Sequence, residues 1–508
     1  MRDYTDYTQF TAQLLQELNG IFSNEQLQEI TEIIHYYNKY DGKELDEWED
    51  KSKDYEPTKK VANFIAELID KQARFMFGEF PYITVECEDE TAKEKIEDAI
   101  KDINRKNNLA EGFTQAAKDC FIGKRIAIKL NAREGDTRRG VKIMFKNSLE
   151  FVFDTDPEDC REITKLIFYY KSKDAATREE EVWWKQKYEL NEQGMCILNE
   201  GIYNGLGELI QANYVDYNTQ LDFIPGHVIL NDALSGDLQG RSDVAKLVDA
   251  QIDYNRIDSE DTDALLKGMN QIKFTIDAEP QTVVVDGIEV ELPLPLGPGA
   301  YWDLKTAITK ESGQAQAGTL GTDFSYTQKL NDKLDRNKST MYELMNIPEI
   351  DLKELGGVMT SGKSMKALYW QMILKIKEKF TAWKPNLENM YKNAIKMARI
   401  YKLYDIPDVD FDINVELNNP LPEDELEEMQ SDLLKVNAQA MSRLQFITKW
   451  FECSEDEGRE ILQQIATERE MLEDSYSAMV EDTEVGGDED LEDDKEDAED
   501  IDDEGSEE

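Results

Sequence analysis

The chain has 508 residues, 40% of them apolar, which is enough to bury a large core in about three domains. Its formal net charge is −50, and Glu481–Glu508, with eighteen acidic residues and one lysine, leaves about −33 on the rest. Tight conventional DNA binding is excluded because it needs a basic patch. A polyanion could still slide past an acidic surface that repels it within a Debye length of ~8–10 Å.

The cysteines, the N-terminus and the hydropathy exclude further classes. None of the five cysteines forms a C-x-x-C pair, so neither a zinc site nor a disulfide framework is expected. The polar start MRDYTDYTQF is not a signal peptide, and no apolar run approaches the ~18 residues that span a bilayer. We expect a soluble protein, intracellular when made, with no metal, no cofactor and no membrane partner.

The first 240 residues are predicted to form an α+β module. Apolar stripes predict helices at Ile30–Tyr37 and Val61–Ile69, and a charged surface helix is expected at Thr91–Asn107. His227 lies in a further apolar run, IPGHVIL, that is typical of a strand. The other predicted strands are Tyr82–Cys87, Arg125–Leu130, Val141–Phe145, Ile163–Tyr170, Val182–Leu190 and Gly207–Tyr214.

Two long helical runs follow, Ser242–Asn270 and Thr322–Asn346, with Ser242 as the expected cap of the first. The insertion between them contains TVVVDGIEVEL, whose Asp286-Gly287 predicts a β-hairpin. A helix pair with an insertion at one end and a loop at the other is too elongated for an ordinary globular core. We therefore expect it to pack against copies of itself in a ring or tube.

The two runs carry opposite charges. They are either two solvated faces or the two sides of pairs between neighbouring copies. Exposed pairs contribute only ~0–1 kcal/mol each, so such pairing would set register more than stability. The candidate residues are Asp249, Asp253 and Glu260 on the first run and Lys329, Lys333 and Arg336 on the second.

A Gly-rich loop, Glu349–Gly362, leads into a third helical run at about Ser364–Tyr404. Pro385 removes a backbone donor, so a kink or break is expected near Lys384. Residues 421–480 are predicted to be helical, with a capping box formed by Ser454 and Glu457. The acidic, low-complexity end from Glu481 is predicted to be disordered.

Gly357–Ser364 matches the phosphate-binding pattern G-x-x-x-x-G-K-[ST]. Such a loop requires a buried strand directly upstream, and Ile350–Leu355 is too charged to form one. The alternative is a flexible loop before a helix. His35 and His227, the only histidines, are expected to be packed structural residues, so no catalytic residue is predicted and the protein is not expected to be an enzyme.

Four segments resemble one protein family when taken in order. They are Tyr36–Gly42, Asn63–Ile83, Ile224–Leu265 and Ser361–Trp370. Together they are similar to the portal proteins, or head-to-tail connectors, of tailed bacteriophages, of the type found in long-tailed phages of Gram-positive hosts. The resemblance covers residues from about 25 to 480. It does not account for the Walker-like Gly-Lys-Ser or for the acidic tail.

The resemblance implies a portal fold and a ring, usually of twelve subunits, at one capsid vertex. The fold would comprise an α/β wing, a two-helix stem, a small β-containing clip, a long kinked helix and a helical crown. The implied parts are 1–240 wing, 241–270 first stem helix, 271–320 clip, 321–346 second stem helix, 347–363 tunnel loop, 364–420 long helix and return to the wing, 421–480 crown and 481–508 tail.

The resemblance also implies a channel for packaging and ejecting double-stranded viral DNA. The clip would dock the terminase motor and later the head-completion adaptor, and the capsid and scaffolding proteins would be further partners. The protein would reside in the virion, and in the host cytoplasm during assembly. The residues implied to face DNA are Lys353, Gly356, Gly357, Lys363 and Lys366. Two alternatives stay open: a P-loop NTPase acting at Gly357–Ser364, and an acidic assembly scaffold acting through its tail.

Overall fold

The chain forms two compact units, Met1–Pro422 and Glu423–Glu508. Residues 351–361 and 482–508 lie outside the described part, so the predicted loop is only partly covered and the predicted disorder of the tail stays a prediction. The computed structural model describes residues 24–48, 56–159, 161–173, 181–204, 208–269, 272–279, 282–285, 287–291, 304–306, 314–320, 325–350, 362–418, 421, 425–451 and 453–481.

Four helices open the first unit, and α3 shows why these segments are helical. The side chain of Asn63 accepts a 3.1 Å hydrogen bond from the amide of Ala66 and so caps the first turn. Apolar residues spaced by three and four then bury one face of α3. The helices predicted here are confirmed, and α5 is an addition. The four are α2 (Asn24–Tyr40), α3 (Phe64–Phe77), α4 (Glu90–Asn107) and α5 (Leu109–Gly123).

Two antiparallel sheets follow, one of three strands in the order β3-β2-β9 and one of five strands in the order β4-β5-β6-β7-β8. The central strand β2 is buried over Arg125–Leu130, including the charged side chains of Arg125 and Lys129. The predicted strands are confirmed, and β4 and β7 are additional. The bounds are β2 (Arg125–Asn131), β3 (Lys142–Asn147), β4 (Phe151–Thr155), β5 (Ile163–Lys173), β6 (Glu181–Leu190), β7 (Cys196–Tyr203), β8 (Leu209–Asn218) and β9 (Gly226–Leu230).

A long helix, α10 (Trp370–Ile400), brings the chain back to this α+β body, where β14 (Asp412–Glu416) pairs with β1 (Tyr82–Glu86). Of the two outcomes predicted near Lys384, the break is wrong, because α10 continues through Pro385, and the kink stays a prediction. Trp383 and Leu387, on either side of the proline, are buried in the core and hold the helix together. The interruption lies instead at Tyr369, between α10 and the short helix α9 (Gly362–Leu368).

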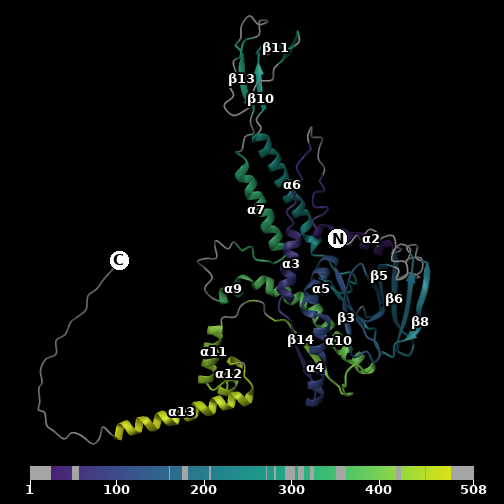
Figure 1. Cartoon of the computed structure of the whole chain (residues 1–508), viewed down its shortest axis with the longest axis vertical. Coiled ribbons are helices and arrows are strands. Elements are labelled where there is room, and N and C mark those ends of the chain that lie inside the picture. The colour runs from purple at the N-terminus through teal and green to yellow at the C-terminus, as the bar shows by residue number, and fades with distance from the viewer. Residues whose placement is uncertain are drawn as a thin grey trace, which may run out of the picture. The chain divides into compact units, whose positions relative to one another are not determined.

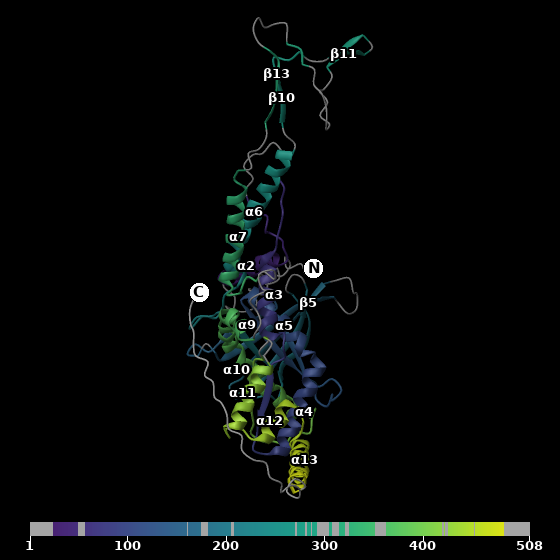
Figure 2. The same cartoon turned by 90° about the vertical axis from the view of Figure 1, so that its left-hand side faces the viewer.

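The predicted helix pair is confirmed as α6 (Val244–Met269) and α7 (Thr327–Leu344), which lie side by side in both views (Figures 1 and 2). The insertion continues beyond their far ends. There β10 (Ile272–Ile276) pairs with β13 (Gln316–Leu320). The predicted hairpin is also present, with β11 (Thr282–Val285) paired to β12 (Ile288–Glu291). Gly287 adopts a φ of 81°, which its turn needs and a side chain would disfavour.

The second unit is helical, as predicted for residues 421–480. It contains α11 (Glu425–Asn437), α12 (Arg443–Trp450) and α13 (Glu455–Glu481). The capping box before α13 is confirmed: the amide of Ser454 donates to Glu457 at 2.9 Å, and the amide of Glu457 donates back to Oγ of Ser454 at 3.4 Å. A second capping box, formed by Ser442 and Gln445, starts α12.

Candidate functional site

The N-terminal end of α6, called its root below, is anchored in the α+β body. Oγ of Ser242 accepts a 3.1 Å hydrogen bond from the amide of Val244, the first helical residue, and donates one of 2.6 Å to the carbonyl of Ile122. Ser242 therefore caps the helix as predicted and also ties it to α5. Val244 and Leu247 are fully buried, so the first two turns of α6 belong to the core.

An extended segment, residues 56–63, lies along α6 and is called the strap below. Four polar side chains of α6, spaced by four, are buried beneath it. Four residues of helix rise about 6 Å and two residues of extended chain about 6.6 Å, so every second amide of the strap meets the next side chain. The four side chains are Gln251, Asn255, Ser259 and Asp263.

The hydrogen bonds form a ladder along the strap and into α3. The amide of Thr58 donates to Asp263 at 3.1 Å, that of Lys60 to Ser259 at 2.9 Å, that of Ala62 to Asn255 at 3.1 Å, and that of Phe64 to Gln251 at 2.8 Å. All four acceptors are side chains of α6 and all four donors are backbone amides. The ladder therefore binds the backbone of the strap and does not depend on the strap's side chains. Val61, predicted to be helical, lies in this extended segment and is exposed, because α3 begins only at Phe64, after the cap Asn63.

The predicted charged faces of the helix pair meet at one point within the chain. Oδ2 of Asp253 lies 3.6 Å from Nζ of Lys333 and accepts a 3.2 Å hydrogen bond from Asn337, so α6 and α7 are joined inside one subunit. The other predicted residues are exposed and are not brought together here. They are Asp249, Glu260, Lys329 and Arg336.

The predicted DNA-facing residues are only partly described. Lys353, Gly356 and Gly357 lie outside the described residues. Lys363 stands in the first turn of α9, and Lys366 is half-buried on the same helix. The structure therefore places two of the five on one short helix.

The described residues before the P-loop pattern at Gly357–Ser364 do not supply the structural context that such a loop requires. A phosphate-binding loop follows directly from a buried strand. The described elements that directly precede residue 351 are α7, which ends at Leu344, and an irregular stretch over residues 345–350. The part of the chain described here therefore offers no strand from which such a loop could emerge.

Five buried or half-buried charged side chains meet where α10 crosses the root of α6, and we call them the ion cluster. Nζ of Lys379 lies 2.6 Å from Asp243 and donates a 2.7 Å hydrogen bond to Asn231. Both ions of the first pair are almost completely shielded from water. The ion cluster consists of Asp232, Asp243, Lys246, Lys375 and Lys379.

The remaining contacts close the ion cluster into a network. Lys246 lies 2.7 Å from both Asp232 and Asp243, and Lys375 lies 3.1 Å from Asp232. Burial alone would raise the pKa of Asp243, but the attraction of Lys379 and Lys246 lowers it overall, and the pKa of Asp232 is lowered in the same way. Sequence reasoning missed this group, because nothing local distinguishes these acids and lysines from the many others.

The two histidines have structural partners. His35 is more exposed than predicted and lies 2.7 Å from Glu44, whereas His227 contacts Asn393 at 3.4 Å. Burial lowers the pKa of His227 to about 4, so this ring is neutral near pH 7. Among the described residues, no three His, Cys, Asp or Glu side chains gather as a metal site would require.

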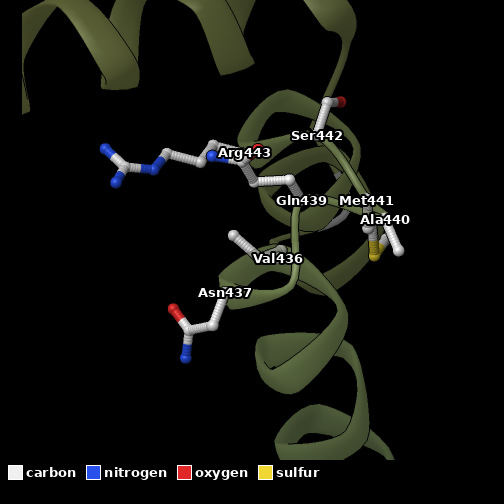
Figure 3. A pocket seen from close by; sticks show the side chains of 7 residues that line it. All are labelled: Val436, Asn437, Gln439, Ala440, Met441, Ser442 and Arg443. Carbon is white, nitrogen blue, oxygen red and sulfur yellow. The ribbon is translucent and has the colours of Figure 1, made fainter.

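The second unit carries a hollow of about 480 Å³ at the turn between α11 and α12 (Figure 3). Its hydroxyl, on Ser442, is engaged in capping α12. The side chains of Asn437 and Arg443 extend to one side of the turn (Figure 3), which leaves a polar rim and no acid–base pair. The lining residues are Val436, Asn437, Gln439, Ala440, Met441, Ser442 and Arg443.

Comparison with known proteins gives one clear match. The family model described as "Phage portal protein, SPP1 Gp6-like" matches residues 20–474, which is most of the chain. No curated protein matches it. None of the helices described here is long and apolar enough to cross a membrane.

Proposed function

The chain belongs to the SPP1 Gp6-like family of phage portal proteins, and from this premise we propose that its copies form a ring, usually of twelve subunits, at one capsid vertex. As a portal protein, it is a capsid component that serves DNA packaging. The further proposal is that the ring itself is the channel through which viral DNA enters and leaves. The match over residues 20–474 is the observation that carries this function.

The helix pair supports a ring. None of residues 327–336 of α7 is fully buried, so α6 covers the first half of this helix only in part. Near the far end of α6, Leu265 is 50% exposed and Met269 is 73% exposed. Apolar side chains gathered at such a place usually mark a contact surface. Neighbouring subunits standing side by side would cover both helices.

We assign the parts of the chain as follows. The wing is 1–240, the stem consists of 241–270 and 321–346, and the clip is 271–320. The tunnel loop is 347–363, the long helix with its return to the wing is 364–420, the crown is 421–480 and the tail is 481–508. The strap adds an extended segment to each stem, so each stem consists of two helices and this segment.

The tunnel loop is proposed to touch DNA through Lys353, Lys363 and Lys366, with Gly356 and Gly357 supplying flexibility. The net charge of −50 supports sliding rather than adhesion, because an acidic channel repels phosphates within about 8–10 Å. A few cations on the loop would then make only transient contacts with the DNA.

The clip is proposed to dock the terminase motor and later the head-completion adaptor. Its strands carry exposed apolar residues, among them Ile276, Val284 and Ile288, the last 67% exposed. Capsid and scaffolding proteins would contact other surfaces in the virion and in the host cytoplasm during assembly. We further propose a long-tailed phage of a Gram-positive host, and a protein without enzymatic activity whose motor supplies the ATP hydrolysis.

Electron microscopy of the purified protein, viewed down its symmetry axis, tests the proposal. We expect hollow rings, both for the full chain and for a variant that lacks Glu481–Glu508. A monomer at every concentration would contradict the ring. Rings that form only when the tail is present would favour an acidic scaffold instead.

A further inference from the structure

The ion cluster joins two helices that lie far apart in the sequence. Lys246 belongs to the first turn of α6, whereas Lys375 and Lys379 belong to the half of α10 that precedes Pro385. Asp232 and Asp243 lie on the segment between β9 and α6 and receive lysines from both helices. The root of α6 is thus tied to α10 by hydrogen-bonded charges.

Lys379 occupies a position where packing alone would favour an apolar residue. Its neighbours on the same face of α10, Ile376, Phe380 and Trp383, are all buried. Removing an ammonium group from water is costly, and well-packed apolar residues often replace a buried ion pair without loss of stability. The pair adds specificity of position. Its hydrogen bonds are directional, so they fix the position of α10 relative to the acceptors Asp243 and Asn231.

The part of α10 held in this way leads directly to α9. The ring of Tyr369, between the two helices, stacks on Phe75 of α3 with centroids 5.7 Å apart. α9 begins at Gly362, at the end of the tunnel loop 347–363 assigned above to DNA contact. The position of α10 at the N-terminal end of α6 therefore determines where the tunnel loop ends.

We propose that Lys379 is a positioning residue of the DNA conduit, which fixes α10, and with it the start of α9, to the root of α6 through Asp243 and Asn231. The inference rests on the proposed function, since it needs the tunnel loop to precede α9. It assigns Lys379 no contact with DNA.

A double substitution separates positioning from stability. Lys379→Met alone leaves Asp243 buried without its main partner, and we expect a lowered Tm. Lys379→Met with Asp243→Leu replaces the pair by apolar groups, and we expect rings with a Tm close to that of the wild type. In capsids assembled with this variant, nuclease-protected DNA should fall at least tenfold, and amides of α9 and the first turns of α10 should exchange hydrogen faster.

The matched control is Lys384→Met, on the same helix but bonded to Asn414 rather than to the ion cluster. It should package like the wild type. The proposal is overturned if the double variant forms rings and packages normally with unchanged exchange. If the double variant does not assemble, Lys375→Gln at the partly exposed edge of the ion cluster replaces it, with the same two readouts deciding. Absence of rings in the wild type would instead contradict the proposed function.

Discussion

The amide of Ala62 donates a 3.1 Å hydrogen bond to Oδ1 of Asn255, a residue 193 positions later in the chain. This is one of the two middle hydrogen bonds of the four-bond ladder that fastens the strap to α6. Asn255 also donates to the carbonyl of Leu45 at 3.1 Å and accepts from Gln251 at 3.1 Å. One buried amide side chain thus holds three segments together at the stem.

Asn255→Ala should lower the free energy of unfolding by about 1–3 kcal/mol, because it leaves buried backbone groups without partners. Urea unfolding measures the change. Glu260→Ala, an exposed site on the same helix, is the control and should change the free energy by less than about 0.5 kcal/mol. Equal effects of the two substitutions would show that the strap is not held by the ladder.

Local patterns in the sequence predict most of the elements but not the contacts between them. The apolar spacing in Phe64–Phe77 and the turn at Asp286-Gly287 act over a few residues, so α3 and the β11–β12 hairpin were predictable. The strap was not, because its amides are satisfied by side chains about 200 residues away. The polar stripe from Gln251 to Asp263, spaced by four, was the available signal.

The same distinction applies to the candidate site. The charge pattern predicted that Asp253 and Lys333 lie on opposing helices. It could not distinguish an ion pair within one subunit from an ion pair between two subunits. Pro385 predicted a kink or a break, and the tertiary packing of Trp383 and Leu387 prevents the break. The ion cluster depends on three segments meeting in space, the connection between β9 and α6, α6 itself and α10, and no single stretch of sequence contains its pattern.

Gly240→Ala should be strongly destabilising. Gly240 has a φ of 73°, and a Cβ added there would lie 2.5 Å from the carbonyl oxygen of Lys124. The left-handed backbone costs an alanine about 1–2 kcal/mol before any clash is counted, so we expect a total loss of at least about 3 kcal/mol. The measurement is thermal unfolding followed by circular dichroism.

The matched control for Gly240 lies four residues earlier. Gly236 has a φ of 77°, but a Cβ there would meet no atom within 4 Å. Gly236→Ala should therefore show the backbone cost alone, about 1–2 kcal/mol. Similar losses at both positions would mean that the close approach at Gly240 is relieved by movement of the chain.

Charge reversal on α7 tests pairing between subunits. Lys329→Glu with Arg336→Glu changes two exposed residues and should weaken ring formation at low salt, with the difference from the wild type shrinking as salt screens the charges. Lys333→Glu is the comparison, because Lys333 already faces Asp253 within its own subunit. Sedimentation across a salt series gives the ring fraction, and an unchanged ring yield for the double variant would refute the pairing.

Deleting Val358–Thr360 tests the tunnel loop. In the sequence these residues lie between α7 and α9, outside the segments proposed to form ring contacts, so we expect rings to form normally. A shorter loop cannot reach the DNA as far, and we expect capsids with less nuclease-protected DNA. The assignment of 347–363 to DNA contact is withdrawn if packaging by this variant equals that of the wild type.

His227 should make the free energy of unfolding depend on pH between about 6.5 and 4. A substitution of His227 should remove this dependence. Burial lowers its pKa from the ordinary 6.5 to about 4, so the folded chain resists a proton that the unfolded chain accepts. Stability from this residue is complete above pH 6.5 and is lost as the pH falls towards 4. Since the side chain is not wholly shielded from water, we expect a loss of about 1–2 kcal/mol rather than the full effect of the shift.

Urea unfolding at pH 6.5, 5.5 and 4.5 measures this loss. His227→Gln removes the titrating ring and should flatten the upper part of the profile, where few carboxylates yet titrate. His35→Gln is the natural control, because it removes the other histidine of the chain, an exposed one paired with Glu44. The control should retain the fall in stability. A profile for His227→Gln that matches the wild type would assign the fall to His35 or to carboxylates, and the His35→Gln profile distinguishes these two sources.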